Sequence, residues 1–344
     1  MARDERARVS AAGTDSKELD TAIAADFSRR AKRVEDLGYR SVDAEFLTAV
    51  ALLGGFFVRR QYRAFRGVGK GSAEVRLVGR TMTNGHVRVN GRRPALYRLC
   101  GASLFGAVGC ADPGSGAGRA RRAAKQRLLV LDYWIARMGE GRFLLTAAHK
   151  AAYFASLGIG EDCFPAAAAG NRQNGRKFFP EGFPIGAASA GSKSVRFTYA
   201  HAGSSAHGME RHLASHEPLA AALAQRDIAC EWVVLADTEA QFARLRDSWR
   251  RWQARAERDW SEGEYFELRR LVDKRRWQQL SREDVERFAY LSGLHRSAAA
   301  EQRYRAWARN GARPRNPGGD FAASCRYREV LMEFDYAAAD AASR

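Results

Sequence analysis

The stretch "RGVGKGSAEVRLVGRTMTNGHVRVNGRRPALYRL", residues 66–99, carries the local signals that decide the fold of the first third of the chain. Its glycine-rich start predicts a sharp turn over 67–71, followed by a helix over 72–83 with Ser72 as its expected N-cap. The helix has apolar residues at i, i+3 and i+7, which predicts one buried stripe. The expected stripe is Val75, Val78 and Met82.

The second half of the stretch predicts a β-hairpin. Asn84-Gly85 supplies a left-handed exit from the helix, and the alternating segments on either side of Asn90-Gly91 form two strands. Arg92 and Arg93 occupy the tip of this hairpin. The stretch therefore reads as turn, helix and basic-tipped hairpin.

A nucleotide-binding P-loop is excluded by spacing. Such a loop needs Gly-x-x-x-x-Gly-Lys-Ser/Thr, so that backbone amides surround the phosphates. Counting from Lys70, the first glycine is replaced by Ala64 and the hydroxyl residue by Gly71. The glycines are better explained as the turn between two helices.

Two more helices are predicted upstream. Residues 41–53 begin at a capping candidate, Ser41, and end before Gly54-Gly55; a shorter helix covers 57–65. The inward-facing residues expected from the spacing are Phe46, Leu47, Val50 and Leu53 in the first helix and Val58, Tyr62 and Phe65 in the second.

Positive charge is concentrated on this part of the chain. The protein has 344 residues, 57 Lys and Arg against 39 Asp and Glu, and a net charge of +18. Residues 1–36 are neutral, with eight basic and eight acidic side chains, whereas 58–100 carry eleven basic side chains and one acid, Glu74. A general compositional bias would be spread evenly, so the focused charge favours a nucleic-acid contact.

Three helices followed by a basic hairpin resemble the winged helix-turn-helix. In that class the third helix enters the major groove and the wing contacts the backbone or minor groove, so the resemblance implies the following contacts. The groove-facing candidates are Ser72, Glu74, Arg76, Arg80 and Asn84. The wing candidates are Arg88, Arg92 and Arg93, and the phosphate-binding candidates are Arg59, Arg60, Arg63 and Lys70. The alternative is a winged helix that docks onto another protein.

A Gly/Ser/Pro-rich linker over 111–118 predicts a domain boundary. Two helices follow: one over 119–138, packing through Leu128, Leu131, Tyr133, Trp134 and Ile135, and one from 146 to 159 capped by Thr146. His149 on the latter has no partner at metal-ligand spacing and is expected to be structural.

Residues 176–255 predict a small α/β unit. Strands over 193–203 and 228–237 alternate with helices over 204–227 and 237–255, which implies a parallel strand pair with a right-handed crossover. The segment 176–186 is expected to add an antiparallel edge strand or hairpin.

A winged helix followed by such a unit resembles the replication-relaxation-type proteins of bacterial plasmids and integrative elements, over about residues 40–255. Their second domain is similar to the PD-(D/E)xK nuclease fold, whose live members hold Mg²⁺ with acids and a lysine on a central strand. The matching strand here, "VRFTYAHAG", has neither acid nor lysine, and Glu181 is the acid near the first position. The resemblance therefore implies a fold relative without catalysis.

His212 and His216 have the i, i+4 spacing of two metal ligands on one helix face. A zincin would also need a glutamate directly after the first histidine, where Leu213 stands, so no metal is expected. No cofactor is expected either. The alternative from the enzyme class is a DNA-processing nuclease with a non-standard metal set drawn from Glu181, Asp237 or the histidines.

The complete expectation is a mixed α+β and α/β protein. Its predicted parts are an N-terminal helix and tail over 1–40, a winged helix over 41–110, a degenerate nuclease-like α/β domain over 119–255 and a helical region over 256–344. Scattered cysteines, with no apolar spanning segment and no visible signal peptide, predict a cytoplasmic, nucleoid-associated protein that does not contact membranes. The predicted function is non-catalytic binding of double-stranded DNA, as a monomer or homodimer, in transcription or in replication or mobilisation of a mobile element.

Overall fold

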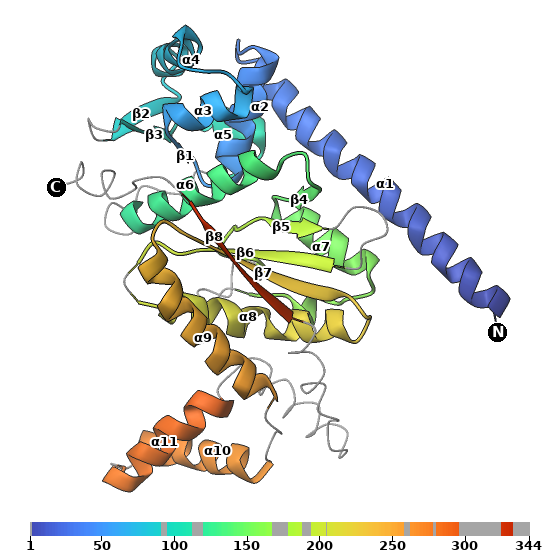
Figure 1. The fold of residues 1–344 in the computed structure, drawn as a ribbon, viewed down its shortest axis with the longest axis vertical. Helices are drawn as coiled ribbons and strands as arrows, with labels where there is room; N and C mark the ends of the chain where they lie inside the picture. Colours follow the sequence, from blue (N-terminus) through green and yellow to red (C-terminus); the bar gives the residue numbers. More distant parts are fainter. Residues whose placement is uncertain are drawn as a thin grey trace.

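A computed structural model gives the fold (Figure 1). It describes residues 2–90, 95–111, 120–166, 178–187, 194–203, 205–257, 262–277, 280–295 and 325–332, and the side chains of 2–17 and a few helix-end residues within these ranges are not described. The expected mixture of helices and strands is confirmed. The predicted linker and the hairpin tip with Arg92 and Arg93 lie almost entirely outside the described residues.

The first part of the chain contains the predicted helices and hairpin. The helix α1 (Ala2–Glu35) precedes an N-terminal module of α2 (Ser41–Leu52), β1 (Phe56–Phe57), α3 (Arg59–Arg66), α4 (Ser72–Thr83), β2 (Val87–Asn90), β3 (Leu96–Leu99) and α5 (Ala102–Val108). The three strands form an antiparallel sheet in the order β1-β3-β2. Residues 102–108, for which the sequence predicted no element, form a helix that buries Leu104, Phe105 and Val108.

The predicted core of α2 is confirmed, but the predicted stripe of α4 is partly wrong. Val75 is 51% exposed and Met82 is 49% exposed, while Leu77, Val78 and Thr81 are buried. The buried face is therefore rotated relative to the predicted one. The reason is that Glu74 turns inward to bond Arg63, which brings Leu77 and Thr81 to the core side.

The second part of the chain is built on a five-stranded mixed sheet in the order β4-β5-β6-β7-β8. The strands are β4 (Arg142–Leu144), β5 (Ile185–Ala187), β6 (Ser194–Ala200), β7 (Ala229–Ala236) and β8 (Cys325–Leu331). The predicted parallel pairing of β6 with β7 and the antiparallel strand β5 beside β6 are both present.

Helices cover both faces of this sheet (Figure 1). The helix α6 (Ala120–Arg137) lies on one face, between the sheet and the N-terminal module. The helices α8 (His207–Ala224) and α9 (Glu239–Glu257) lie on the other face. The helix α7 (Ala147–Ser156) packs its Phe154 ring on Phe197 of β6, and a short 3-10 turn, η1 (Glu161–Cys163), follows.

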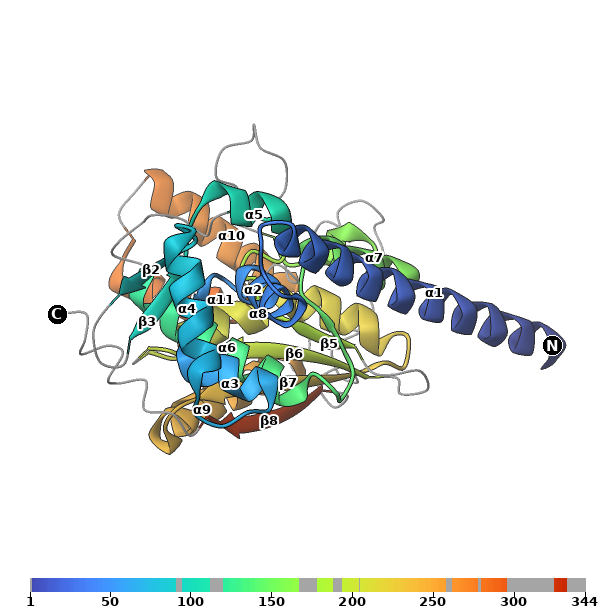
Figure 2. The same cartoon turned by 90° about the horizontal axis from the view of Figure 1, so that it is seen from above.

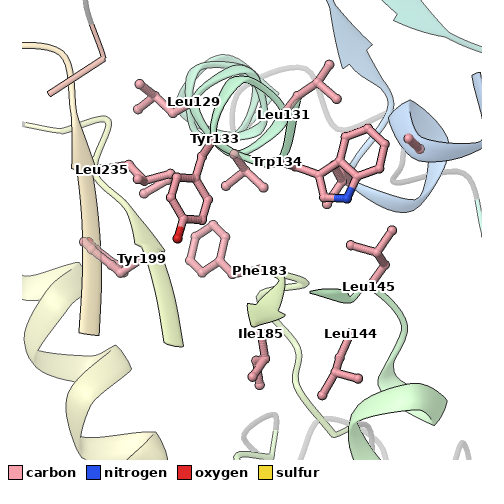
Figure 3. Close-up of a cluster of buried hydrophobic side chains, with 14 of the residues drawn as sticks. Leu129, Leu131, Tyr133, Trp134, Leu144, Leu145, Phe183, Ile185, Tyr199 and Leu235 are labelled. Atoms are coloured by element: carbon pink, nitrogen blue, oxygen red, sulfur yellow. The ribbon is translucent and has the colours of Figure 1, made fainter. Parts of the chain in front are cut away.

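The helix α6 joins the two parts of the molecule because its residues 128–134 are all buried between them. Gln61 of α3 donates a hydrogen bond to the carbonyl oxygen of Leu128 at 2.8 Å, and the Phe65 ring stacks on Trp134. On the sheet side, Gln126 donates to the carbonyl oxygen of Ala200. Figure 3 shows Leu129, Tyr133 and Trp134 of α6 among side chains of the sheet. The two predicted domains thus share one continuous core.

The C-terminal region differs from the expected helical region. The helices α10 (Glu262–Trp277) and α11 (Arg282–His295) pack on each other through Leu268, Leu271 and Leu291. Residues 325–331 instead form β8, which pairs in parallel with β7 along its whole length. The strand pairs with the backbone N–H and C=O groups that would otherwise be open along the edge of β7. The α/β unit therefore extends beyond the predicted boundary at residue 255.

Candidate nucleic-acid interface

The outward face of α4 is the surface on which the predicted groove contacts meet. The helix projects from the end of the molecule opposite α10 and α11 and is not covered by any other described element (Figures 1 and 2). Helical spacing places Arg76 and Arg80 along one edge of this face. The exposed centre is formed by Ser72, Gly79 and Thr83, and the other edge by Val75 and Met82.

The cationic edge of α4 has no acidic partner in the described structure. Arg76 donates to the hydroxyl of Ser72, one turn earlier, and Arg80 donates to the carbonyl oxygen of Gly38 at 3.0 Å. Neither arginine forms an ion pair with a described carboxylate. Both guanidinium groups are therefore held toward solvent with most of their donors available to an anion.

The start of α4 differs from the prediction. Gly71 rather than Ser72 is the N-cap, and the Glu74 carboxylate accepts a hydrogen bond from the Gly71 amide at 3.4 Å. The same carboxylate bonds Arg63 at 3.0 Å and is buried. Glu74 is thus an internal capping group and not a groove-facing side chain. The hydrogen bond from its own backbone amide, together with those from Arg63 and Gly71, outweighs the effect of burial and lowers its pKa.

Some of the arginines predicted to contact phosphate instead bond other side chains of the protein, and the others face solvent. Arg60 forms an ion pair with Asp132 at 2.5 Å, which links α3 to α6. Arg63 links α3 to α4 through its ion pair with Glu74. Arg59 is exposed but donates to the Tyr97 hydroxyl at 2.7 Å. The interface proposed below therefore does not include Arg60 and Arg63.

Lys70, Asn84 and Arg88 remain exposed beside α4. Lys70 lies in the turn before the helix, Asn84 is its C-cap, and Arg88 lies on β2 directly opposite Arg98 of β3. These positions extend the cationic surface from α4 onto the hairpin.

The acids and histidines of the α/β unit do not gather into one metal-ligand set. Asp237 forms a buried ion pair with Lys125 of α6 at 2.7 Å, on one face of the sheet. Glu181 bonds His212 of α8, on the other face, and this contact outweighs burial to lower the Glu181 pKa to about 2. Among the described residues, no group of three or more His, Cys, Asp or Glu is placed to hold a metal ion.

Sequence reasoning missed three parts of the α4 face: Val75, Gly79 and Met82. Two features of the sequence could have indicated the exposed face. Leu77 is as apolar as Val75 and could be the buried residue in its place, and Glu74 is the single acid among eleven basic residues and could have an internal partner. His149, expected to be structural, contacts Asp26 of α1 at 2.9 Å.

No family model, curated protein or solved structure matches the chain. No helix in the described part of the chain is long and apolar enough to cross a membrane.

Proposed function

We propose that the chain is a non-catalytic protein that binds double-stranded DNA, with the N-terminal module acting as a winged helix and α4 as its recognition helix. The observation that carries this proposal is the cationic edge of α4: Arg76 and Arg80 face solvent on a projecting helix without a described acidic partner. The resemblance to replication-relaxation-type proteins adds the proposed context, which is transcription or the replication or mobilisation of a mobile element.

The composition of the α4 face suits the edges of base pairs. A guanidinium group donates two hydrogen bonds to guanine O6 and N7, which is the role proposed for Arg76 and Arg80. Apolar side chains contact the thymine methyl group, which is the role proposed for Val75 and Met82. Lys70 and Arg88 flank the helix and are proposed to contact phosphates, which fix position without reading sequence.

The decisive experiment selects bound duplexes from a random pool and follows cleavage products in the same tubes, with Mg²⁺ or Mn²⁺ present. The expected result is an enriched sequence, salt-dependent binding and intact DNA. Cleavage would instead support a nuclease with a non-standard site.

Replacing the arginines of α4 tests the recognition surface. Arg76→Ala and Arg80→Ala should each weaken binding to the selected site by about 1–3 kcal/mol, because each removes a base contact. Affinity is measured by fluorescence anisotropy at fixed salt. Arg250→Ala, on the exposed surface of α9, removes one positive charge away from α4 and is the matched control. Parental affinity in both α4 variants contradicts the assignment of α4 as the recognition helix.

A second function is favoured by the apolar groups of the same module. Val68, Val75, Met82 and Val89 are all large and exposed, and a protein partner would bury such side chains. Under this docking function, the chain fails to bind duplex DNA even at low salt. The anisotropy measurement at low salt therefore separates the two.

A further inference from the structure

A cavity of about 730 Å³ lies between α7, α8 and the five-stranded sheet. Its walls come from α7, the segment 179–185, β6 and α8. The apolar lining includes the rings of Phe179, Phe183 and Phe197. The polar groups that reach it include Lys150, Glu181, Arg211 and His212. Small-molecule sites have this size and this combination of apolar walls with a few convergent polar groups.

Lys150 brings a positive charge into the cavity wall. Its side chain is buried, with 2% of the residue exposed, and Nζ donates to the carbonyl oxygen of Phe183 at 2.6 Å. Nζ also lies 5.4 Å from the centre of the Phe179 ring. Within the described residues, no carboxylate forms an ion pair with this ammonium group. A buried ammonium normally has an anionic partner, because burial without one is costly.

The carboxylate that lines the cavity already has a hydrogen-bond partner. The Glu181 carboxylate bonds Nδ1 of His212, while Nε2 of the same ring is buried and has no hydrogen-bond partner in the described structure. His216 lies behind it, and burial lowers the pKa of His216 to about 3, so this ring is neutral at neutral pH. Arg211 is exposed at the rim. At and below pH 7 the lining therefore has two cations, Lys150 and Arg211, against one carboxylate that already bonds His212.

We propose that this cavity binds a small organic anion, a carboxylate or phosphate group on an apolar body. The anionic group pairs with Lys150 Nζ, the apolar body lies against the phenylalanine rings, and a polar atom of the ligand bonds His212 Nε2. This site is distinct from the α4 surface, and it is tested on the protein without DNA.

The experiment uses titration calorimetry and thermal unfolding with benzoate, phenyl phosphate and citrate, with benzyl alcohol as the neutral analogue of benzoate. At least one anion should bind and raise the Tm, and benzyl alcohol should bind at least tenfold more weakly than benzoate. The carboxylate and phosphate arms identify which anionic group is preferred. Above pH 7, affinity should fall roughly tenfold per pH unit as Lys150 loses its proton.

Lys150→Met keeps the length of the side chain and removes the charge. It should reduce the affinity for the bound anion at least tenfold while the protein stays folded, because it replaces a buried ammonium by an apolar group. Arg250→Met, on the exposed surface of α9, removes a positive charge that pairs within α9 and should leave affinity unchanged. The proposal is overturned if none of the three anions binds the parent, or if Lys150→Met binds them equally well.

Discussion

The ammonium group of Lys150 is buried between the Phe179 ring and the carbonyl oxygen of Phe183. Burial, together with the positive charge of Arg127, lowers its pKa to about 7, and the negative charge of Glu181 opposes this shift. In the unfolded chain the same group has a pKa of about 10.4. Between these two values the unfolded chain binds more protons than the folded protein, so stability rises with pH.

This difference predicts a measurable pH dependence. Between pH 7 and pH 9, Lys150 should add about 2 kcal/mol to the free energy of unfolding, from 1.36 kcal/mol per pH unit beyond the folded pKa. Urea unfolding at the two pH values measures it in the parent and in Lys150→Met. The variant should lose this increment and should be at least as stable as the parent at pH 7. If the free energy of unfolding rises equally in both proteins, a group other than Lys150 causes the pH dependence.

Among the helices, α4 has an interior glycine at the centre of its solvent face. A Cβ atom built on Gly79 meets no other atom within 4 Å, so nothing within the described structure requires glycine at this position. Glycine inside a helix costs about 0.5–1 kcal/mol relative to alanine. Under the proposed function, a small residue at this position would let a partner approach the α4 backbone closely.

Two substitutions test this explanation. Gly79→Ala should raise the free energy of unfolding by about 0.5–1 kcal/mol, because it removes backbone freedom from the unfolded chain. Gly79→Leu should fold but weaken duplex binding at least tenfold, since its side chain separates α4 from the base edges. Gly106→Leu, at an equally open position of α5, is the control and should bind DNA like the parent. Unchanged binding by Gly79→Leu would remove the α4 face from the interface.

At the scale of the whole molecule, Arg127 of α6 connects the N-terminal module to the anion cavity. A Cβ atom on Gly54, in the turn between α2 and β1, would lie 2.3 Å from Cδ of Arg127. The guanidinium group of the same arginine lies 5.6 Å from the centre of the Phe183 ring, which lines the cavity. The long helix α1 adds a second connection, because His149 of α7 bonds its Asp26 and Arg142 of β4 its Asp20.

This contact makes Gly54 a sensitive position. Gly54 has a φ of +113° and Gly38 a φ of +88°, so alanine is strained at both, but a Cβ on Gly38 meets nothing within 4 Å. Gly54→Ala should therefore destabilise the protein by at least about 1 kcal/mol more than Gly38→Ala, since the half-buried side chain of Arg127 must move. Denaturant unfolding of the two variants gives the difference. Equal losses would mean that Arg127 shifts freely.

Local patterns predicted most of the elements and little of the site. The strand predicted over 193–203 is β6, and Thr146 was predicted as the cap of α7, which the hydrogen bond from the His149 amide confirms. The stripe of α4 was misplaced because Val75 and Leu77 are equally apolar in the sequence. The choice between them depends on Glu74 reaching Arg63 in another helix.

Most of the helices, the strands β6 and β7 with their parallel pairing, and the focused positive charge follow from the sequence alone, because periodicity, capping residues and turn signals act over a few neighbouring residues. Only the tertiary structure decided which face of α4 is exposed, which arginines are engaged internally, and that β8 completes the sheet. It also assembled the cavity, whose Lys150, Glu181 and His212 come from three separate segments. Such contacts depend on the packing of distant segments around α6 and the sheet, which no local pattern encodes.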